Sequence, residues 1–488
     1  MASVDRKTDY RVTFFVLCLG VSSFALLHSM VAPVLPTFER AFDTDQQTVT
    51  WVLTAYLLSA SVFTPIMGRI GDKVGKERML VVTLGALAVG SLIAALAPSI
   101  EVLVVARVVQ GIGGGVLPLT FGIIRDEFPA ERVAGAIGTS AALLAVGSGL
   151  GLVVAGPIVD LLSYHWLFWI PMGITTVAAL AAWKFVPESP VRTPGRINVG
   201  TALLLSAWLV ALLLGVSEGR NWGWTSPAVL GLLLGAVVIA AVWVKAEVVS
   251  AEPLIDMRMM AVPAVATTNL VALLFGVTMY SLFAFLPQFL QTPEATGYGF
   301  GASVTQSGLL LLPQAVMTFI AGIYSGRLAA RHGSKRVLAV GASLSAASLY
   351  ALAFAHGELW MVLVGTLVSG GAFGLAFAAM SNLVVESVPR SQTGVASGMN
   401  TNIRTVGGAI GGALVAGIIT AGARPDGLPV ESGYTNGFLL LAVVGTLAAL
   451  AATLVPTPPA APAAGDETGA APPPELAVAA GGRPPAGR

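Results

Sequence analysis

The sequence has 488 residues, of which 55% are hydrophobic and only 10% are charged, and its formal net charge is +1. A chain with this composition and a mean hydropathy of +0.82 cannot hide its apolar surface in a water-soluble core, so we expect it to lie in a membrane. The near-zero charge argues against a nucleic-acid-binding protein, and the single cysteine, Cys18, excludes a disulfide within the chain.

Fourteen apolar segments are long enough to span a bilayer, which takes about 20 helical residues. The first segment follows Arg6, Lys7 and Arg11 and lacks a small-residue cleavage site, so we expect an uncleaved span rather than a signal peptide. Turn sequences such as Ala97-Pro98-Ser99 separate the segments. We predict spans at 12–34, 49–70, 79–97, 102–124, 134–160, 166–186, 199–217, 227–249, 264–290, 305–328, 336–355, 359–382, 394–421 and 436–455.

Two hairpins between spans repeat each other in sequence. Residues 67–80 read MGRIGDKVGKERML, and residues 325–338 read SGRLAARHGSKRVL. In both, a glycine and an arginine end an apolar run, and basic residues around a second glycine lead into the next run. Such a repeat indicates two related halves, which is how many secondary transporters are built.

The halves also share pairs of small residues that let helices pack closely. Gly147 and Gly151 in the fifth span match Gly407 and Gly411 in the thirteenth, and Gly156-Pro157 follows in the fifth. The spans at 199–217 and 227–249 have no counterpart, so we expect an insert. We predict an all-α integral membrane protein with a cytoplasmic N-terminus (1–11), a six-helix bundle (12–186), two inserted central helices with linkers (187–262), a second six-helix bundle (263–455) and a disordered cytoplasmic tail (456–488).

Basic residues set the orientation that we expect in the membrane. With both termini in the cytoplasm, the outer loops hold only Arg40, Arg220 and Arg424, whereas the inner loops hold many more. This asymmetry follows the positive-inside rule. The inner loops hold Arg69, Lys73, Lys76, Arg78, Arg125, Arg132, Lys184, Arg192, Arg196, Lys245, Arg258, Arg327, Arg331, Lys335, Arg336 and Arg390.

Two motifs of the first half resemble those of the major facilitator superfamily. The hairpin Gly68-x3-Asp72-Lys73-x-Gly75-Lys76 is similar to the superfamily's loop motif, and Arg107-x2-Gln110-Gly111-x-Gly113-Gly114 is similar to its fourth-helix motif. With fourteen spans, and with Asn402-Ile403-Arg404-Thr405-Val406-Gly407-Gly408 in the thirteenth, residues 11–455 resemble the drug:proton antiporters of that superfamily. The antiporter motif of the fifth span is degraded, because its proline comes only at Pro157.

The resemblance implies a major facilitator fold in which two bundles rock to give alternating access, and the first hairpin is expected to act as a conformational latch. Asp72 is expected to pair with arginines of a neighbouring loop and to hold one state. The second hairpin has Ala330 at the position of Asp72, so we expect only one half to carry the latch. The latch residues are Gly68, Asp72, Lys73, Gly75 and Arg78.

The first span departs from the family pattern where transport is expected to be coupled to protons. Antiporters of this kind carry an aspartate there, whereas this chain reads Leu26-Leu27-His28-Ser29-Met30. His28 is the candidate substitute, since imidazole titrates near neutral pH; alternatively, it is a neutral histidine bonded to a neighbouring backbone group or to a serine such as Ser29. Arg107 and Asp160 are further proton-coupling candidates. Arg107 could tune a proton site or orient a helix, or it could reach a headgroup from its shallow position in the span, and Asp160 could be a solvated helix end.

Polar and charged residues inside spans are costly in lipid and therefore need a reason. Arg404 lies about ten residues into its span, near the midplane, where we expect its partner to be a carbonyl, an aromatic face, water, or an anionic group of the substrate. An apolar pocket with a few hydrogen-bonding groups would suit bulky hydrophobic compounds. The cavity candidates are Tyr56, Gln110, Asn269, Tyr280, Phe283, Gln288, Gln314, Phe373, Phe377, Asn400, Asn402 and Arg404.

The sequence has no Walker-type phosphate loop and no metal-ligand spacing, so we expect no ATP or other cofactor, no metal and no enzymatic activity. It predicts a secondary exporter of hydrophobic or amphipathic organic compounds such as drugs, antibiotics or toxic metabolites. We expect exchange for protons by a monomer in the cell membrane, with the bilayer, the substrate and protons as partners and no nucleic acid. Two alternatives stay open: a transporter dedicated to one metabolite, and a non-transporting membrane sensor or scaffold with the same fold.

Overall fold

The predicted all-α membrane fold with fourteen spans is confirmed. The computed structural model describes residues 9–44, 46–189, 198–250, 252–420 and 428–456, so the predictions for residues 1–8 and for the tail after 456 lie outside the described residues. Within these residues fourteen helical spans are long and apolar enough to cross a membrane, and no strand is present. The helices of these spans are α1 (Tyr10–Ser29), α3 (Gln46–Val74), α4 (Lys76–Ala95), α5 (Ile100–Gly111) with α6 (Val116–Glu127), α7 (Ala130–Leu161), α8 (Trp166–Phe185), α9 (Val199–Trp222), α10 (Pro227–Val249), α12 (Pro263–Gln291), α13 (Val304–His332), α14 (Ser334–Phe354), α15 (Leu359–Ser387), α16 (Thr393–Thr420) and α17 (Glu431–Leu454).

Shorter elements connect these helices, and one of them interrupts the fourth span. There, α5 passes through a 3-10 turn, η2 (Ile112–Gly115), into α6. Consecutive glycines weaken an α-helix but allow neighbouring helices to come close: a Cβ on Gly115 would lie 2.5 Å from the Met67 Cβ of α3. The other short elements are η1 (Ala32–Val34), α2 (Leu35–Ala41), α11 (Met257–Met260), η3 (Glu294–Thr296) and η4 (Arg390–Gln392).

The two repeated hairpins fold alike. A single glycine joins α3 to α4 and another joins α13 to α14, namely Gly75 with a φ of 131° and Gly333 with a φ of 85°. Side chains other than hydrogen are disfavoured at such positive φ values. The second glycine of each repeat is therefore required by the sharp turn between two helices.

Within each half, the paired glycines bring two helices into close contact. A Cβ on Gly147 of α7 would lie 2.5 Å from a side chain of α1, and a Cβ on Gly411 of α16 would lie 2.8 Å from the backbone of α12. Gly151 and Gly407 approach the same partner helices even more closely. Contacts of small residues are a main source of helix association in membranes, so the α1–α7 pair of the first half is the counterpart of the α12–α16 pair of the second.

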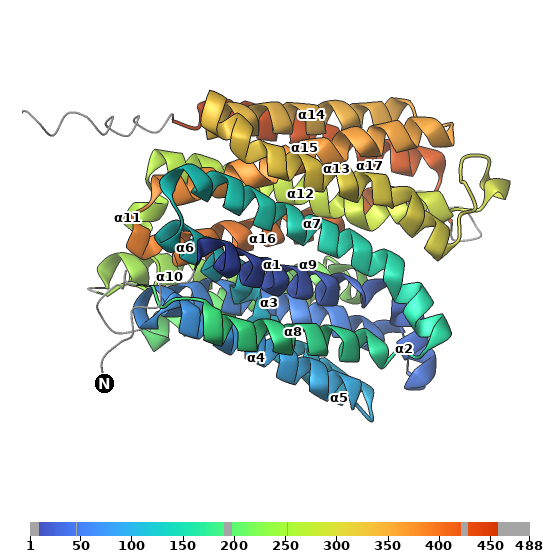
Figure 1. The fold of residues 1–488 in the computed structure, drawn as a ribbon. Helices are drawn as coiled ribbons and strands as arrows, with labels where there is room; N and C mark the ends of the chain where they lie inside the picture. The colour runs from blue at the N-terminus through green and yellow to red at the C-terminus, as the bar shows by residue number, and fades with distance from the viewer. Residues whose placement is uncertain (1–8, 45, 190–197, 251, 421–427, 457–488) are drawn as a thin grey trace, which may run out of the picture. The chain divides into compact units, whose positions relative to one another are not determined.

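The main contacts between the halves lie along two helix pairs, α3 with α16 and α7 with α13 (Figure 1), and smaller contacts join α6 to α16 and α7 to α15. The α7–α13 pair stays in contact along most of its length, from Gly135 beside Gly326 to Gly156 beside Thr305. Pro157, predicted as a packing residue, is exposed on α7. The α3–α16 pair is close only near one end, where the backbones of the two helices approach each other at Gly68 and Gly394.

The inserted helices lie on the α3–α16 side of the molecule. Helix α9 packs on α3 and α16, and α10 packs mainly on α9. Their connection to α12 is anchored by side chains: the Arg69 guanidinium donates to the Pro253 carbonyl at 3.1 Å, and the Glu247 carboxylate accepts from the Leu254 N–H at 2.8 Å. The insert is therefore attached to the first half through α3 and to the second half through α16.

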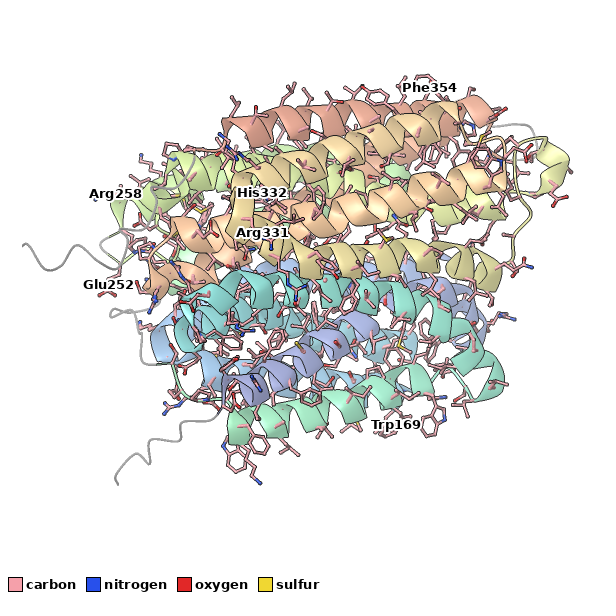
Figure 2. All side chains as sticks on the ribbon, turned by 45° about the horizontal axis from the view of Figure 1, so that its top comes forward. Trp169, Glu252, Arg258, Arg331, His332 and Phe354 are labelled. Carbon is pink, nitrogen blue, oxygen red and sulfur yellow. The ribbon has the colours of Figure 1, made fainter. Side chains whose placement is uncertain are left out.

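The helices run roughly side by side, so the bundle has two ends. Figure 2 shows Glu252 and Arg258 at one of them, and Trp169 and Phe354 toward the other. The first end includes the C-terminus of α3 and the N-terminus of α16, and we name it the Asp72 end. The second includes the C-terminus of α16, and we name it the Thr420 end.

Candidate functional site

A cavity of about 940 Å³ lies between the two halves. Its lining comes from both halves and from α9 of the insert, and it reaches the Thr420 end, where Trp224, Gly417 and Thr420 line it. Toward the other end, the last lining residue of α3 is Thr64. A volume of this size falls in the range of sites for drug-sized ligands, about 300–1,000 Å³.

Eight residues that were predicted for this cavity or for proton coupling line it. They come from α1, α3, α12, α13, α15 and α16, so the site is assembled from distant parts of the chain. They are His28, Tyr56, Tyr280, Phe283, Gln314, Phe377, Asn402 and Arg404.

Five predicted cavity residues lie elsewhere, because a helix presents only one face to the cavity and the sequence does not fix its rotation. Gln288 is exposed. Asn400 donates to Asn269 at 2.9 Å, which pairs the two side chains between α16 and α12. Phe373 is fully buried against the edges of other phenylalanine rings, and Gln110 belongs to a buried network beside α4.

That network holds Arg107, which is fully buried behind the cavity wall. Its Nε donates to the Val52 carbonyl at 3.0 Å and its Nη1 donates to Gln110 Oε1 at 2.7 Å, while Gln110 in turn donates to the Ser91 hydroxyl at 3.0 Å. The guanidinium carbon lies 4.2 Å from the centre of the Tyr56 ring. Arg107 is thus enclosed by protein rather than exposed toward a headgroup, and it contacts the ring of Tyr56, which lines the cavity.

His28 lines the cavity beside Tyr56, with the two ring centres 5.1 Å apart. Its Nδ1 is buried and has no hydrogen-bond partner among the described residues, whereas Ser29 donates to carbonyls of its own helix. The predicted neutral pairing of His28 with Ser29 is therefore not formed. His28, Tyr56 and Arg107 form a continuous row that leads from the cavity into the first half.

Arg404 enters the cavity from the second half. It is buried, and its guanidinium carbon lies 4.1 Å from the centre of the Phe377 ring, so an aromatic face is one of its partners, as the sequence suggested. Tyr280 also interacts with it. Its Nε has no hydrogen-bond partner among the described residues.

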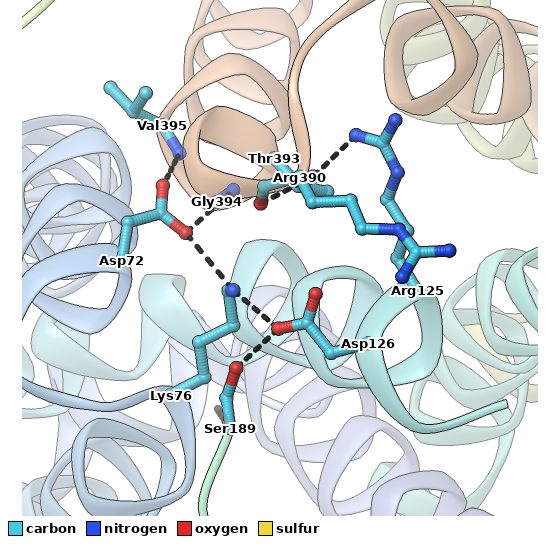
Figure 3. A network of polar contacts seen from close by, with 9 residues as sticks. All are labelled: Asp72, Lys76, Arg125, Asp126, Ser189, Arg390, Thr393, Gly394 and Val395. Atoms are coloured by element: carbon cyan, nitrogen blue, oxygen red, sulfur yellow. Dashed lines mark hydrogen bonds and ion pairs between the residues drawn. The ribbon is translucent and has the colours of Figure 1, made fainter. Parts of the chain in front are cut away.

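At the Asp72 end, the α3–α16 contact is closed by a charged group. The buried Asp72 carboxylate accepts hydrogen bonds from the N–H groups of Gly394 (3.3 Å) and Val395 (3.0 Å), in the first turn of α16 (Figure 3). The N-terminus of a helix offers free N–H groups and a positive dipole end, which together stabilise an anion. Asp72 therefore joins the two halves directly.

Two further groups complete what we name the Asp72 network, which consists of Asp72, Lys76, Asp126, Gly394 and Val395. The Lys76 ammonium lies 3.6 Å from the Asp72 carboxylate and 2.6 Å from that of Asp126, and all three side chains are buried. The Ser189 hydroxyl also donates to Asp126 (Figure 3). The single lysine pairs with both carboxylates, so each buried charge has a partner of opposite sign, although the three side chains together carry one excess negative charge.

The structure corrects the predicted partners of the latch. Asp72 binds the α16 backbone and Lys76 rather than arginines of a neighbouring loop. Arg78 is largely exposed and pairs with Glu188 at 2.8 Å, and Lys73 is partly exposed. Gly68 does belong to the contact, since a Cβ there would lie 2.5 Å from the Gly394 carbonyl oxygen. The side chain of Asp160 lies outside the described residues.

Several residues of the site were missed by sequence reasoning. Asp126 lies far along the chain from Lys76, and Arg125 donates to the Thr393 hydroxyl at 2.6 Å across the two halves. Arg125 and Asp126 are adjacent charged residues at the end of an apolar run, and this pattern could have identified them in the sequence. Ser217 and Trp224, which line the cavity from the insert, had no such signal.

Comparisons with known proteins agree with this architecture. The family model described as Major Facilitator Superfamily matches residues 17–294 and 268–485. The chain is 29% identical over 444 residues to the "Multidrug resistance protein B homolog" of Mycobacterium tuberculosis, covering 86% of this chain and 80% of that protein. It is 28% identical over 436 residues to the "Tetracenomycin C resistance and export protein" of Streptomyces glaucescens, covering 87% and 78%.

Solved structures share the fold at low sequence identity. The human organic anion transporter MFSD10 superposes with a TM-score of 0.67 at 17% identity, over 91% of this chain and 100% of that one. The proton:xylose symporter XylE superposes with a TM-score of 0.65 at 14% identity, over 92% and 96%. Since the family model matches most of the chain and the fold agrees, this chain belongs to the major facilitator superfamily of membrane transporters.

Proposed function

We propose that this protein exports hydrophobic or amphipathic organic compounds across the cell membrane in exchange for protons. The observation that carries the proposal is the apolar cavity between the two halves, which is open toward one end and closed at the other by the Asp72 network. Two relatives are named as a multidrug resistance protein and as a resistance and export protein, and these names support the proposal of export.

The Asp72 end carries most of the basic loop residues, so the positive-inside rule assigns it to the cytoplasm. The described conformation is then closed to the cytoplasm, with its cavity reaching the outer face. An exporter must also visit the opposite state, in which the Asp72 network is broken and the cavity faces inward. Alternating access of this kind needs two arrangements of the same contacts that differ by only a few kcal/mol, on the order of 2–5.

Proton exchange needs a group that changes its charge within the cavity. His28 is the candidate, because it lies on the lining, has a ring nitrogen without a hydrogen-bond partner among the described residues, and packs against the tilted ring of Tyr56, which covers Arg107. The Arg107 guanidinium carries a fixed positive charge on the other side of the Tyr56 ring from His28. Movement of Tyr56 between the two states would change how strongly that charge acts on His28, and this would release or admit a proton.

A transport assay with a trapped pH indicator tests the proposal. Purified protein is placed in liposomes with an acidic interior that contain pyranine, and ethidium, 8-anilinonaphthalene-1-sulfonate and Nile red are added one at a time. We expect at least one compound to make the interior more alkaline faster than in protein-free liposomes. No acceleration with any compound, together with no uptake of the dyes, would count against export.

The role of His28 is tested by the His28→Gln variant. We expect it to keep exchange of internal for external dye but to lose the coupled pH change. His356→Gln is the matched control, since His356 is also buried but lies beside Glu431, away from the cavity lining. An unchanged proton-to-dye ratio in His28→Gln would end its coupling role and leave the export proposal intact.

A further inference from the structure

The cavity holds a buried cation that no acid in its lining balances. Among the described residues that line it, Arg404 is the one permanently charged side chain, and no aspartate or glutamate occurs. The nearest acid in sequence to any lining residue is Glu218, between Ser217 and Gly219 on α9; it is buried, does not line the cavity, and has contacts of its own. Among the described residues, the cavity lining itself therefore carries one fixed positive charge and no negative charge.

Arg404 is only partly satisfied by the protein. Its side chain is 1% exposed and lies deep in α16, eleven residues after Thr393, or about 16 Å along the helix. The Phe377 face and Tyr280 contact the guanidinium, yet its Nε has no hydrogen-bond partner among the described residues. A guanidinium offers five donors in a planar fork that matches a carboxylate or sulfonate, so an anion is the ligand that this group fits.

Other buried polar atoms of the cavity are also without partners. Both amide atoms of Asn402, which is 2% exposed, lack a hydrogen bond among the described residues, and so do the hydroxyl groups of Tyr56 and Ser61. All of these residues line the cavity. Since buried polar groups are normally paired, they would provide secondary contacts for polar substituents. The remaining wall is largely apolar and includes the rings of Phe283 and Phe377.

We propose that the substrates are amphipathic organic anions with one acidic group that pairs with Arg404 and an aromatic or aliphatic body that fills the apolar part of the cavity. This inference rests on the proposed export function and adds to it the sign of the charge that the substrates carry, which we name the charge class. Lipophilic cations of the same size are rejected, because they would meet the Arg404 charge with no carboxylate to offset it.

Binding of two matched compounds tests the charge class without requiring transport. Naphthalene-2-sulfonate and naphthalen-2-yl-trimethylammonium share the ring system and differ in the sign of their charge. Equilibrium dialysis against the full-length protein in a neutral detergent gives both dissociation constants. We expect the sulfonate to bind at least about tenfold more tightly, since a charge-assisted hydrogen bond changes affinity by about 10- to 100-fold. Equal or tighter binding of the ammonium compound would overturn the proposal.

Variants of Arg404 test whether this residue causes the preference for the sulfonate. Arg404→Gln should weaken sulfonate binding by about 10- to 100-fold and leave ammonium binding unchanged or stronger, whereas Arg404→Lys, which keeps the charge, should retain most of the sulfonate affinity. The matched control is Arg327→Gln, because Arg327 is an exposed arginine over the Tyr324 ring and does not line the cavity. It should change neither constant by more than about twofold. Undiminished sulfonate binding in a folded Arg404→Gln protein would also overturn the proposal.

The two proposals fail in different ways. If the sulfonate binds through Arg404 but no compound crosses the liposome membrane, the charge class holds and export does not. If ethidium drives the pH change in liposomes and Arg404→Gln leaves it unaltered, export holds and the anionic substrate class is wrong.

Discussion

The two contacts between the halves are equivalent in the repeat but differ in chemistry. At the α3–α16 contact, the backbones approach at Gly68 and Gly394, the Asp72 carboxylate also binds the N-terminus of the opposite helix, and beyond this end the helices separate around the cavity. At the α7–α13 contact, glycines bring the backbones together, since a Cβ on Gly326 would lie 2.5 Å from the Gly135 Cα. Ala330, at the position of Asp72 in the repeat, is exposed.

This difference suggests a division of roles between the two contacts. A small number of hydrogen bonds to one carboxylate can break and re-form together. The net free-energy cost of breaking each of them is small, because a hydrogen bond to water replaces it. A close backbone contact is spread over many atoms and depends on shape. We therefore infer that the α3–α16 contact is the one that opens and closes, and that the glycine contact keeps the halves in register.

The largest expected effect is that of Asp72→Asn, which removes the charge but keeps the size of the side chain. Charge-assisted hydrogen bonds contribute about 1.5–3 kcal/mol, so the closed state should lose about 10- to 100-fold in population and dye transport should fall by at least about tenfold. Asp256→Asn is the control, because Asp256 caps the short helix α11 at the same end. Normal turnover in Asp72→Asn would refute the latch.

The next effect is that of Gly326→Ala, which tests the glycine contact. The added methyl group has no room beside Gly135, and overpacking of this kind costs about 1–3 kcal/mol. We expect a lower melting temperature in detergent and transport reduced by about five- to tenfold. Gly173→Ala, where a Cβ meets nothing within 4 Å, should alter neither. Unchanged stability of Gly326→Ala would show that the contact is loose.

A smaller effect is expected for Arg125→Gln. Its hydrogen bond to Thr393 joins α6 to the start of α16, beside the Asp72 network, but the guanidinium is only partly buried. Because exposed charges contribute little, on the order of 1 kcal/mol or less, transport should fall by about two- to fivefold. A loss as large as that of Asp72→Asn would mean that Arg125, and not the carboxylate, holds the contact closed.

The smallest effect is expected for Ala330→Asp, which copies the carboxylate into the second hairpin. The site is exposed, so the new charge remains in water and transport should change by less than about twofold. If this substitution restored transport to Asp72→Asn, the two contacts would be interchangeable and the division of roles would be wrong.

The sequence predicted the fold well because the features that define the fold are encoded in short stretches of the chain. Span length, turn residues and the glycine in each hairpin lie within short windows, and the repeat related the halves. It also identified Arg404 and His28, since a polar group in an apolar run is conspicuous. The sequence did not predict the partner of Asp72, because that partner is a pair of backbone N–H groups, which every residue type except proline has. Nor did it separate Tyr56, which lines the cavity, from Gln110, which lies behind it, because that depends on helix rotation.

Distance measurement across the α3–α16 contact tests the central claim most directly. In a Cys18→Ser background, spin labels are attached at Val74 and Pro389, two exposed positions beside the Asp72 network, and the distance distribution is recorded by pulsed electron paramagnetic resonance with and without Asp72→Asn. The latch role of Asp72 predicts that a short distance dominates in the parent protein and that a second, longer population appears when the carboxylate is removed. Superimposable distributions would contradict it, because Asp72 would then not hold the two halves together.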